Sequence, residues 1–151
     1  MALLTWSDDY LIGDLTIDTE HKELFRLINS FHNHWQENHD RKSIAAVLNQ
    51  LINYAQMHFQ HEEAIMEEAQ YKKLIEHQAI HESLIDTIFK LHQEYSENHL
   101  HLEMDTMKFV RSWLVDHIVQ NDYLFRDHLR RNKVDPDKEP VTEAQPSAAE
   151  S

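Results

Sequence analysis

Seven histidine and acidic side chains recur along this chain at spacings that suit a buried metal site. They are His21, His58, Glu62, His77, His81, His117 and Asp122. Two of the intervals are four residues long, from His58 to Glu62 and from His77 to His81. Four residues place two side chains about 40° apart on one face of a helix, one turn above each other. Each of these pairs can therefore chelate one centre, and the full set offers enough donors for two metal ions.

The spacing alone does not choose the ion. The chain has no cysteine, so its metal ligands must be nitrogen and oxygen atoms. Imidazole and carboxylate groups hold iron, zinc, copper, manganese or nickel. Carboxylate-rich di-iron bundles use a Glu on each of two helices and Glu-x-x-His on the other two. The set in this chain is instead rich in histidine and poor in glutamate.

One interval does not fit a regular helix. His117 and Asp122 are five residues apart, which separates them by about 140° around an ideal α-helix. A single wider turn of π-helix between them would bring both side chains to the same face. We therefore predict a π-turn at this position.

The composition favours one all-α domain. A chain of 151 residues is long enough for a single domain with a real core. Hydrophobic residues make up 41% of it and charged residues 27%, with one glycine and three prolines. This balance suits long helices and does not suit a turn-rich sheet protein.

The charge of the chain excludes two classes of partner. A formal net charge of -13 repels phosphate backbones and anionic lipid head groups. The first residues contain neither a basic leader nor a long apolar run. We therefore expect a cytoplasmic protein that binds no nucleic acid and does not insert into membranes. The lack of cysteine suits such a reducing compartment.

Apolar residues at steps of three and four predict four helices, at about 18–37, 41–68, 71–96 and 104–131. On each helix the apolar stripe runs through the candidate ligands. Short connections favour antiparallel neighbours in an up-down-up-down four-helix bundle. With alternating helix directions, all seven candidate ligands meet in one half of the bundle. Asp18 is the predicted N-cap of the first helix.

Two segments flank the predicted bundle. Residues 1–17 form an arm with Trp6, Tyr10 and Gly13, and we expect its aromatic rings to pack across the helices. Residues 132–151 contain all three prolines and no apolar period, which predicts a disordered acidic tail. The bundle domain, with its arm, is therefore expected to span residues 1–131.

The motifs along the chain resemble those of the hemerythrins, particularly the bacterial single-domain members. The resemblance covers nearly all of residues 1–131, and no ligand position of the family is missing. The residues that carry it are Trp6 with Gly13; Ile17, Asp18, His21 and Lys22; His58, Phe59, Glu62, Glu63 and Met66; His77 with His81; and Trp113, Leu114, His117, Ile118 and Asp122.

This resemblance implies a non-haem di-iron centre with an oxo or hydroxo bridge. One iron would be held by His77, His81 and His117, the other by His21 and His58, with Glu62 and Asp122 as bridges. The iron with two histidines would keep an open coordination position for dioxygen. The positions expected to line the dioxygen pocket are Leu24, Phe59, Trp113, Leu114 and Ile118.

The function that the resemblance implies is reversible dioxygen binding, for storage or for delivery to an oxygen-consuming enzyme, and we expect a monomer. Imidazoles and carboxylates suit divalent iron, and bridging carboxylates hold two ions close enough to act together. Alternatives at the same centre are an oxidase, an enzyme that consumes peroxide or nitric oxide, an oxygen or redox sensor, and an iron buffer. No separate acid, base or nucleophile stands out beside the ligands, so we do not expect an enzyme.

The remaining polar candidates are left outside the site. Glu63 either accepts an N–H from a ligand imidazole or is an exposed or helix-capping carboxylate. Trp6, Phe31 and Trp35 are expected to pack in the core or the arm. Eight further histidines are expected to be solvated or to cap helices: His32, His34, His39, His61, His92, His99, His101 and His128.

Overall fold

The structure is a computed structural model that describes residues 2–132, and within these residues the chain is helical with no strand. A 3-10 turn, η1, spans Asp8–Tyr10, and the helices are α1 (Leu15–Gln36), α2 (Arg41–Glu68), α3 (Leu74–Ser96), α4 (Met104–His117) and α5 (Tyr123–Asn132). A π-helical turn, η2, spans Ile118–Asp122 and joins α4 to α5. The predicted tail lies outside the described residues, except that Asn132 is the last residue of α5.

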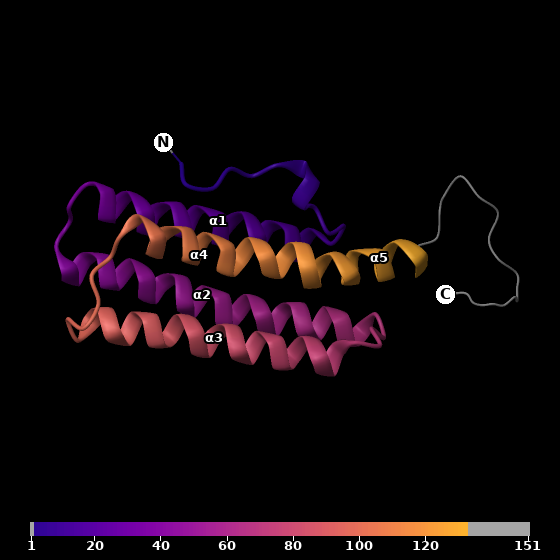
Figure 1. Cartoon of the computed structure of the whole chain (residues 1–151). Helices are drawn as coiled ribbons and strands as arrows, with labels where there is room; N and C mark the ends of the chain where they lie inside the picture. The colour runs from indigo at the N-terminus through magenta and orange to yellow at the C-terminus, as the bar shows by residue number, and fades with distance from the viewer. Residues whose placement is uncertain (1, 133–151) are drawn as a thin grey trace, which may run out of the picture.

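The helices form the predicted antiparallel four-helix bundle (Figure 1). Along the chain, α1, α2 and α3 alternate in direction, and α4 runs back beside α1 (Figure 1). α4, η2 and α5 form one continuous rod, because helical backbone angles persist at Ile118 and Tyr123, where the segments join. Among the described residues, no helix is both long and apolar enough to span a membrane.

Three helices of the bundle end without glycine. The residue that turns the chain has a positive φ after each of them; these residues are Asn38 (58°), Gln70 (57°) and Asn98 (64°). After α1, the N–H of Asn38 donates to the carbonyl of Trp35, and the N–H of His39 donates to that of His34. This pair of bonds is the Schellman motif, and the same pattern follows α2 and α3. These tight ends hold successive helices antiparallel.

The first helix begins earlier than predicted. Its N-cap is Asp14, whose carboxylate accepts the N–H of Ile17 at 3.1 Å, so the prediction that Asp18 is the N-cap is wrong. Asp18 lies inside α1, where its carboxylate accepts the N–H groups of Ile12 at 2.7 Å and Gly13 at 3.1 Å. The φ of Gly13 is 104°, a conformation that favours glycine. The turn at Gly13 therefore lets Asp18 tie the arm to the helix.

The arm packs along the bundle through its aromatic rings. Trp6 and Tyr10 each meet Phe25 of α1 edge to face, with ring centroids 5.1 Å apart. Leu4 and Asn29 add a pair of hydrogen bonds, of 2.9 Å and 2.7 Å, between the backbone of the arm and the amide side chain. The expected aromatic packing of the arm is therefore present.

Within residues 2–132, the core consists of two apolar clusters separated by polar side chains. The larger cluster includes Leu24, Leu51, Ile88, Trp113 and Leu114. The smaller cluster contains Ile12, Ile17, Met66, Tyr71 and Phe125. On α1, His21 lies between Ile17 of the smaller cluster and Leu24 of the larger one. The same order recurs on α2 and along the rod of α4, η2 and α5. A buried polar layer therefore crosses the interior of the bundle.

Candidate metal centre

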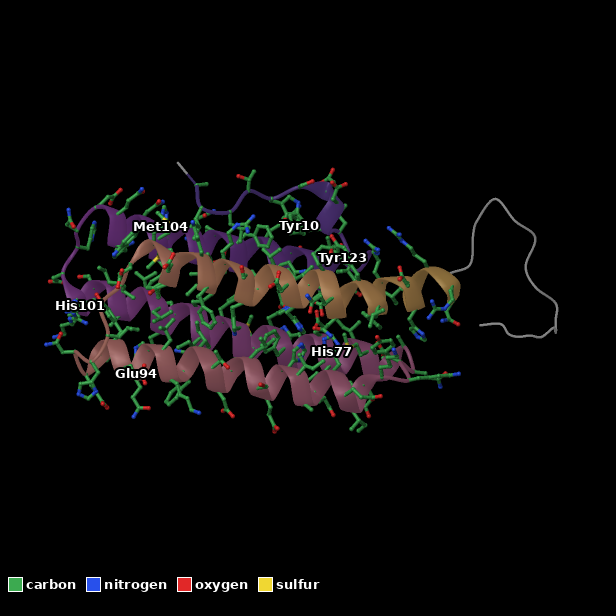
Figure 2. The ribbon with its side chains drawn as sticks, viewed as in Figure 1. Tyr10, His77, Glu94, His101, Met104 and Tyr123 are labelled. Carbon is green, nitrogen blue, oxygen red and sulfur yellow. The ribbon has the colours of Figure 1, made fainter. Side chains whose placement is uncertain are left out.

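The structure brings all seven predicted ligands together in this polar layer. α1 provides His21, α2 provides His58 and Glu62, α3 provides His77 and His81, α4 provides His117, and η2 provides Asp122. None of these residues is more than 4% exposed. Figure 2 shows His77 on the inner side of α3, where nitrogen and oxygen atoms gather between the helices. The layer thus concentrates donor atoms in the buried interior of the bundle.

Glu62 lies between two groups of histidines. Its Oε1 is 3.0 Å from Nε2 of His77 and 3.0 Å from Nε2 of His81. Its Oε2 is 3.5 Å from Nε2 of His21 and 3.5 Å from Nε2 of His58. The two oxygens of one carboxylate therefore face different sets of nitrogen atoms.

Asp122 divides its oxygens in the same way. Its Oδ1 is 3.1 Å from Nε2 of His77 and 3.2 Å from Nε2 of His117. Its Oδ2 is 3.1 Å from Nε2 of His21. The seven residues thus form a group with three histidines and a group with two, and both carboxylates lie between the groups.

The π-turn predicted between His117 and Asp122 is present. η2 spans Ile118–Asp122, and it is the element that places the Asp122 carboxylate beside the ring of His117. In a regular α-helix these side chains would point about 140° apart. The wider turn therefore completes the group with three histidines.

Three of the candidate ligands have their outer ring nitrogen held by a hydrogen-bond acceptor. Nδ1–H of His58 donates to the Glu20 carboxylate at 2.9 Å, and Nδ1–H of His81 donates to Glu63 at 2.6 Å. Nδ1–H of His117 donates to the side-chain oxygen of Asn121 at 3.2 Å. Each bond fixes the proton on Nδ1 and leaves the lone pair of Nε2 directed inward.

The inward nitrogen atoms lie so close together that a cation between them would stabilise their lone pairs. Nε2 of His81 and Nε2 of His117 are 3.1 Å apart, although both rings carry their proton on the other nitrogen. Two donor atoms bound at right angles to one ion, each at about 2.1 Å, lie about 3.0 Å apart. The separations in this layer therefore match neighbouring ligands of a shared metal ion.

Unpaired buried atoms support the same conclusion. Nε2 of His21, Nε2 of His58, Oε2 of Glu62 and both oxygens of Asp122 are buried without a hydrogen-bond partner. Such atoms are costly unless something compensates them. Five of the seven residues form one group of potential ligand atoms, and His21, His58 and Glu62 form a second, with every atom of a group within 4.8 Å of the others. The residues therefore fit two metal ions.

The charges in the layer determine which of its residues carry a proton when no metal is bound. Burial lowers the pKa of His21, but the neighbouring Asp122 and Glu62 carboxylates outweigh burial and raise the pKa to about 10. The pKa of His77 rises to about 9 for the same reasons. Burial raises the pKa of Glu62 and of Asp122, yet the surrounding histidines lower both below their usual range. At neutral pH, protons on His21 and His77 therefore balance the carboxylates when no metal is bound.

The chain matches one protein family over most of its length. The model of the hemerythrin HHE cation binding domain matches residues 13–129. The chain belongs to the hemerythrin family. The resemblance drawn from the sequence motifs is therefore confirmed.

Individual hemerythrins agree with this match. The bacteriohemerythrin of Methylococcus capsulatus is 32% identical over 126 residues, which cover 83% of this chain and 95% of that protein. The myohemerythrin of Theromyzon tessulatum is 26% identical over 124 residues, which cover 82% and 92%. A crystal structure of wild-type hemerythrin matches with a TM-score of 0.76 and 32% identity, covering 85% of this chain and 98% of that one.

Sequence reasoning missed part of the surroundings of this hemerythrin site. It overlooked Glu20 and Asn121 and left Glu63 outside the site. Asn121 had a local signal, since it follows His117 by four residues, whereas Glu20 and His58 are 38 residues apart in sequence. His61, expected to be solvated, is half-exposed and donates Nδ1–H to Glu20 at 2.6 Å.

The position of another histidine, His32, differs from the one predicted. His32 was expected to be solvated or to cap a helix, but it is 4% exposed and lies inside α1 beside the ring of Trp35, so that prediction is wrong. It follows Ile28 and Phe31 on the buried face of α1. The buried face of α1 therefore includes His32 in addition to the hydrophobic residues that mark it in the sequence.

The five residues expected to line a dioxygen pocket are all buried, and each lies within four residues of a candidate ligand in the sequence. They are Leu24, Phe59, Trp113, Leu114 and Ile118. The Phe59 ring stacks on the His81 imidazole, with centroids 3.8 Å apart and planes 6° from parallel. The indole N–H of Trp113 donates to the carbonyl of Leu84 at 2.9 Å. The polar end of that side chain is therefore already bonded to α3.

Metal binding to this layer should displace protons. Zinc titrated into metal-free protein at pH 7 should release protons, because His21 and His77 must lose theirs to bind an ion. The apparent affinity should rise with pH and level off near the His21 pKa of about 10. A titration in weak buffer with a pH indicator measures both effects. Affinity that is independent of pH, with no proton release, would contradict the protonation states assigned here.

Proposed function

We propose that this hemerythrin holds two non-haem iron ions between its helices and binds dioxygen reversibly at them. The observation that supports this most strongly is the position of Glu62 and Asp122, each with its two oxygens turned to different groups of histidines. Carboxylates in this position hold two cations close together. Membership of the hemerythrin family supports iron as the ion and dioxygen as the ligand.

The two groups of ligands are unequal. His77, His81 and His117 would hold one ion together with the shared carboxylates, which gives five donors. His21 and His58 would hold the other ion, with one donor fewer from the protein. The second ion therefore keeps more room for a small ligand. When bound, the pair of irons supplies the two electrons that reversible dioxygen binding needs.

The residues around the site decide whether dioxygen returns unchanged. Leu24, Leu114 and Ile118 are buried apolar side chains of the larger core cluster, and each lies within three residues of a candidate ligand in the sequence. Trp113 is the only one of the five pocket residues with an N–H in its side chain. That N–H already donates to the backbone carbonyl of Leu84. A dry wall without a free proton donor slows water entry and proton delivery. This favours release of the gas over its reduction.

The same features favour binding over turnover. The hydrogen-bond partners of the ligand rings are Glu20, Glu63 and Asn121, and each of them already accepts an N–H from a ligand. The five proposed pocket residues are buried and offer no acid, base or nucleophile. We therefore propose storage of dioxygen, or its delivery to an oxygen-consuming enzyme, as the use of the site. Consumption of dioxygen with a reductant at a steady rate would instead support an oxidase.

Removing the charge of one shared carboxylate tests the ligand assignment. Glu62→Gln should lower iron below two ions per chain and lower the melting temperature of the iron-loaded protein, because the bound ions stabilise the fold. The control is Glu68→Gln, at an exposed position near the end of the same helix. Elemental analysis and thermal unfolding measure the two effects. Full iron content in both variants would remove Glu62 from the proposed ligands.

Opening the apolar wall tests the pocket assignment. Leu114→Ala should keep the iron but oxidise it about tenfold faster in air, because the cavity admits water beside the ligands. Leu48→Ala makes the same change in the larger cluster, far along α2 from His58, and should lower stability without changing the oxidation rate. The rate is followed by absorbance after oxygen is admitted. Equal rates in the two variants would exclude Leu114 from the pocket.

A further inference from the structure

The ligand histidines do not all have the same kind of partner on their outer nitrogen. His58 and His81 each donate Nδ1–H to a carboxylate, from Glu20 and Glu63. His117 donates to a neutral amide, the side chain of Asn121, and its bond is the longest of the three at 3.2 Å. The group with three histidines therefore has one charged and one neutral acceptor behind it.

Asn121 is built into the turn that shapes the site. It lies in η2, directly before Asp122 and four residues after His117. It is half-buried and lines a groove of about 380 Å³ between α3 and α4, which Gln120, Trp113 and His117 also line. Its side chain therefore reaches the ring of His117 from the outer side of the ligand layer.

The charge of such an acceptor alters the ligand. A carboxylate that accepts the N–H of a metal-bound imidazole makes the ring a stronger electron donor, and bonds to charged acceptors are stronger than neutral ones. A stronger donor stabilises ferric iron more than ferrous iron, so it lowers the reduction potential. A neutral amide at the same position also orients the ring, but it strengthens the ring as an electron donor less than a carboxylate does.

We propose that Asn121 is a positioning residue for His117, and that its neutral amide keeps the iron pair in the reduced state that binds dioxygen. This inference rests on the function proposed above. Oxidation in air takes one electron from each ferrous ion, and dioxygen accepts both electrons with two protons from water to leave as hydrogen peroxide. An acceptor that favours the ferric state would make this loss faster.

The two substitutions that separate this role from a structural one are Asn121→Asp and Asn121→Leu. Aspartate keeps the acceptor and adds a charge, whereas leucine keeps the approximate volume and removes the acceptor. The control is Gln120→Glu, which adds a charge in the same groove at an exposed neighbouring position. A residue that only stabilises the turn would not move the potential in opposite directions when charged and when made apolar.

The first measurement needs neither iron nor oxygen. In zinc-loaded protein, proton NMR should show an exchange-protected Nδ1–H signal from His117 in the wild type. The signal should move downfield in Asn121→Asp, because the bond strengthens, and lose its protection in Asn121→Leu. The same signal in the wild type and in Asn121→Leu would overturn the hydrogen bond on which the inference depends.

The second measurement uses the iron-loaded protein. The midpoint potential should fall in Asn121→Asp, rise in Asn121→Leu and stay near the wild-type value in Gln120→Glu. Oxidation in air should be about tenfold faster in Asn121→Asp. Equal potentials in all four proteins, or an equal fall in the Gln120→Glu control, would overturn the role of Asn121. Failure of the wild type to bind dioxygen reversibly would instead overturn the proposed function, whatever the potentials are.

Discussion

The whole bundle depends on a buried layer in which Glu62 and Asp122 each face two groups of imidazoles. The layer interrupts the apolar core between its two clusters, so it must be neutralised from within. Protons on His21 and His77 can do this in the metal-free protein, and two cations can do it better, since the inward lone pairs already converge. The fold is therefore stabilised most when the layer is filled.

Each structural element serves the placement of this layer. The Schellman turns fix the antiparallel order of α1, α2 and α3, which sets the depth of their ligands. The π-turn brings Asp122 beside His117, and the outer acceptors hold the rings with Nε2 inward. The apolar residues next to the layer in the sequence are themselves buried. A site that is buried and unequal in its donors agrees with the reversible binding that we propose.

The bundle and the seven candidate ligands could be predicted from the sequence. Helical periodicity and ligand spacing both show which side chains share a face of a helix. The misfit of five residues between His117 and Asp122 was sufficient to predict the π-turn. Contacts between helices were harder to predict, because no spacing within a single helix relates Glu20 to His58. Asp14 and Asp18 are both acids before the same apolar stripe, and only the backbone turn at Gly13 decides which one caps α1.

The most direct test is the iron content together with the visible absorption spectrum of the purified protein. The spectrum is recorded without oxygen after reduction, again after oxygen is admitted, and again after oxygen is removed. We expect iron for both groups of ligands, and an absorption band that appears with oxygen and disappears when oxygen is removed. Little bound iron, or a band that persists because oxidation is irreversible, would contradict a reversible dioxygen site.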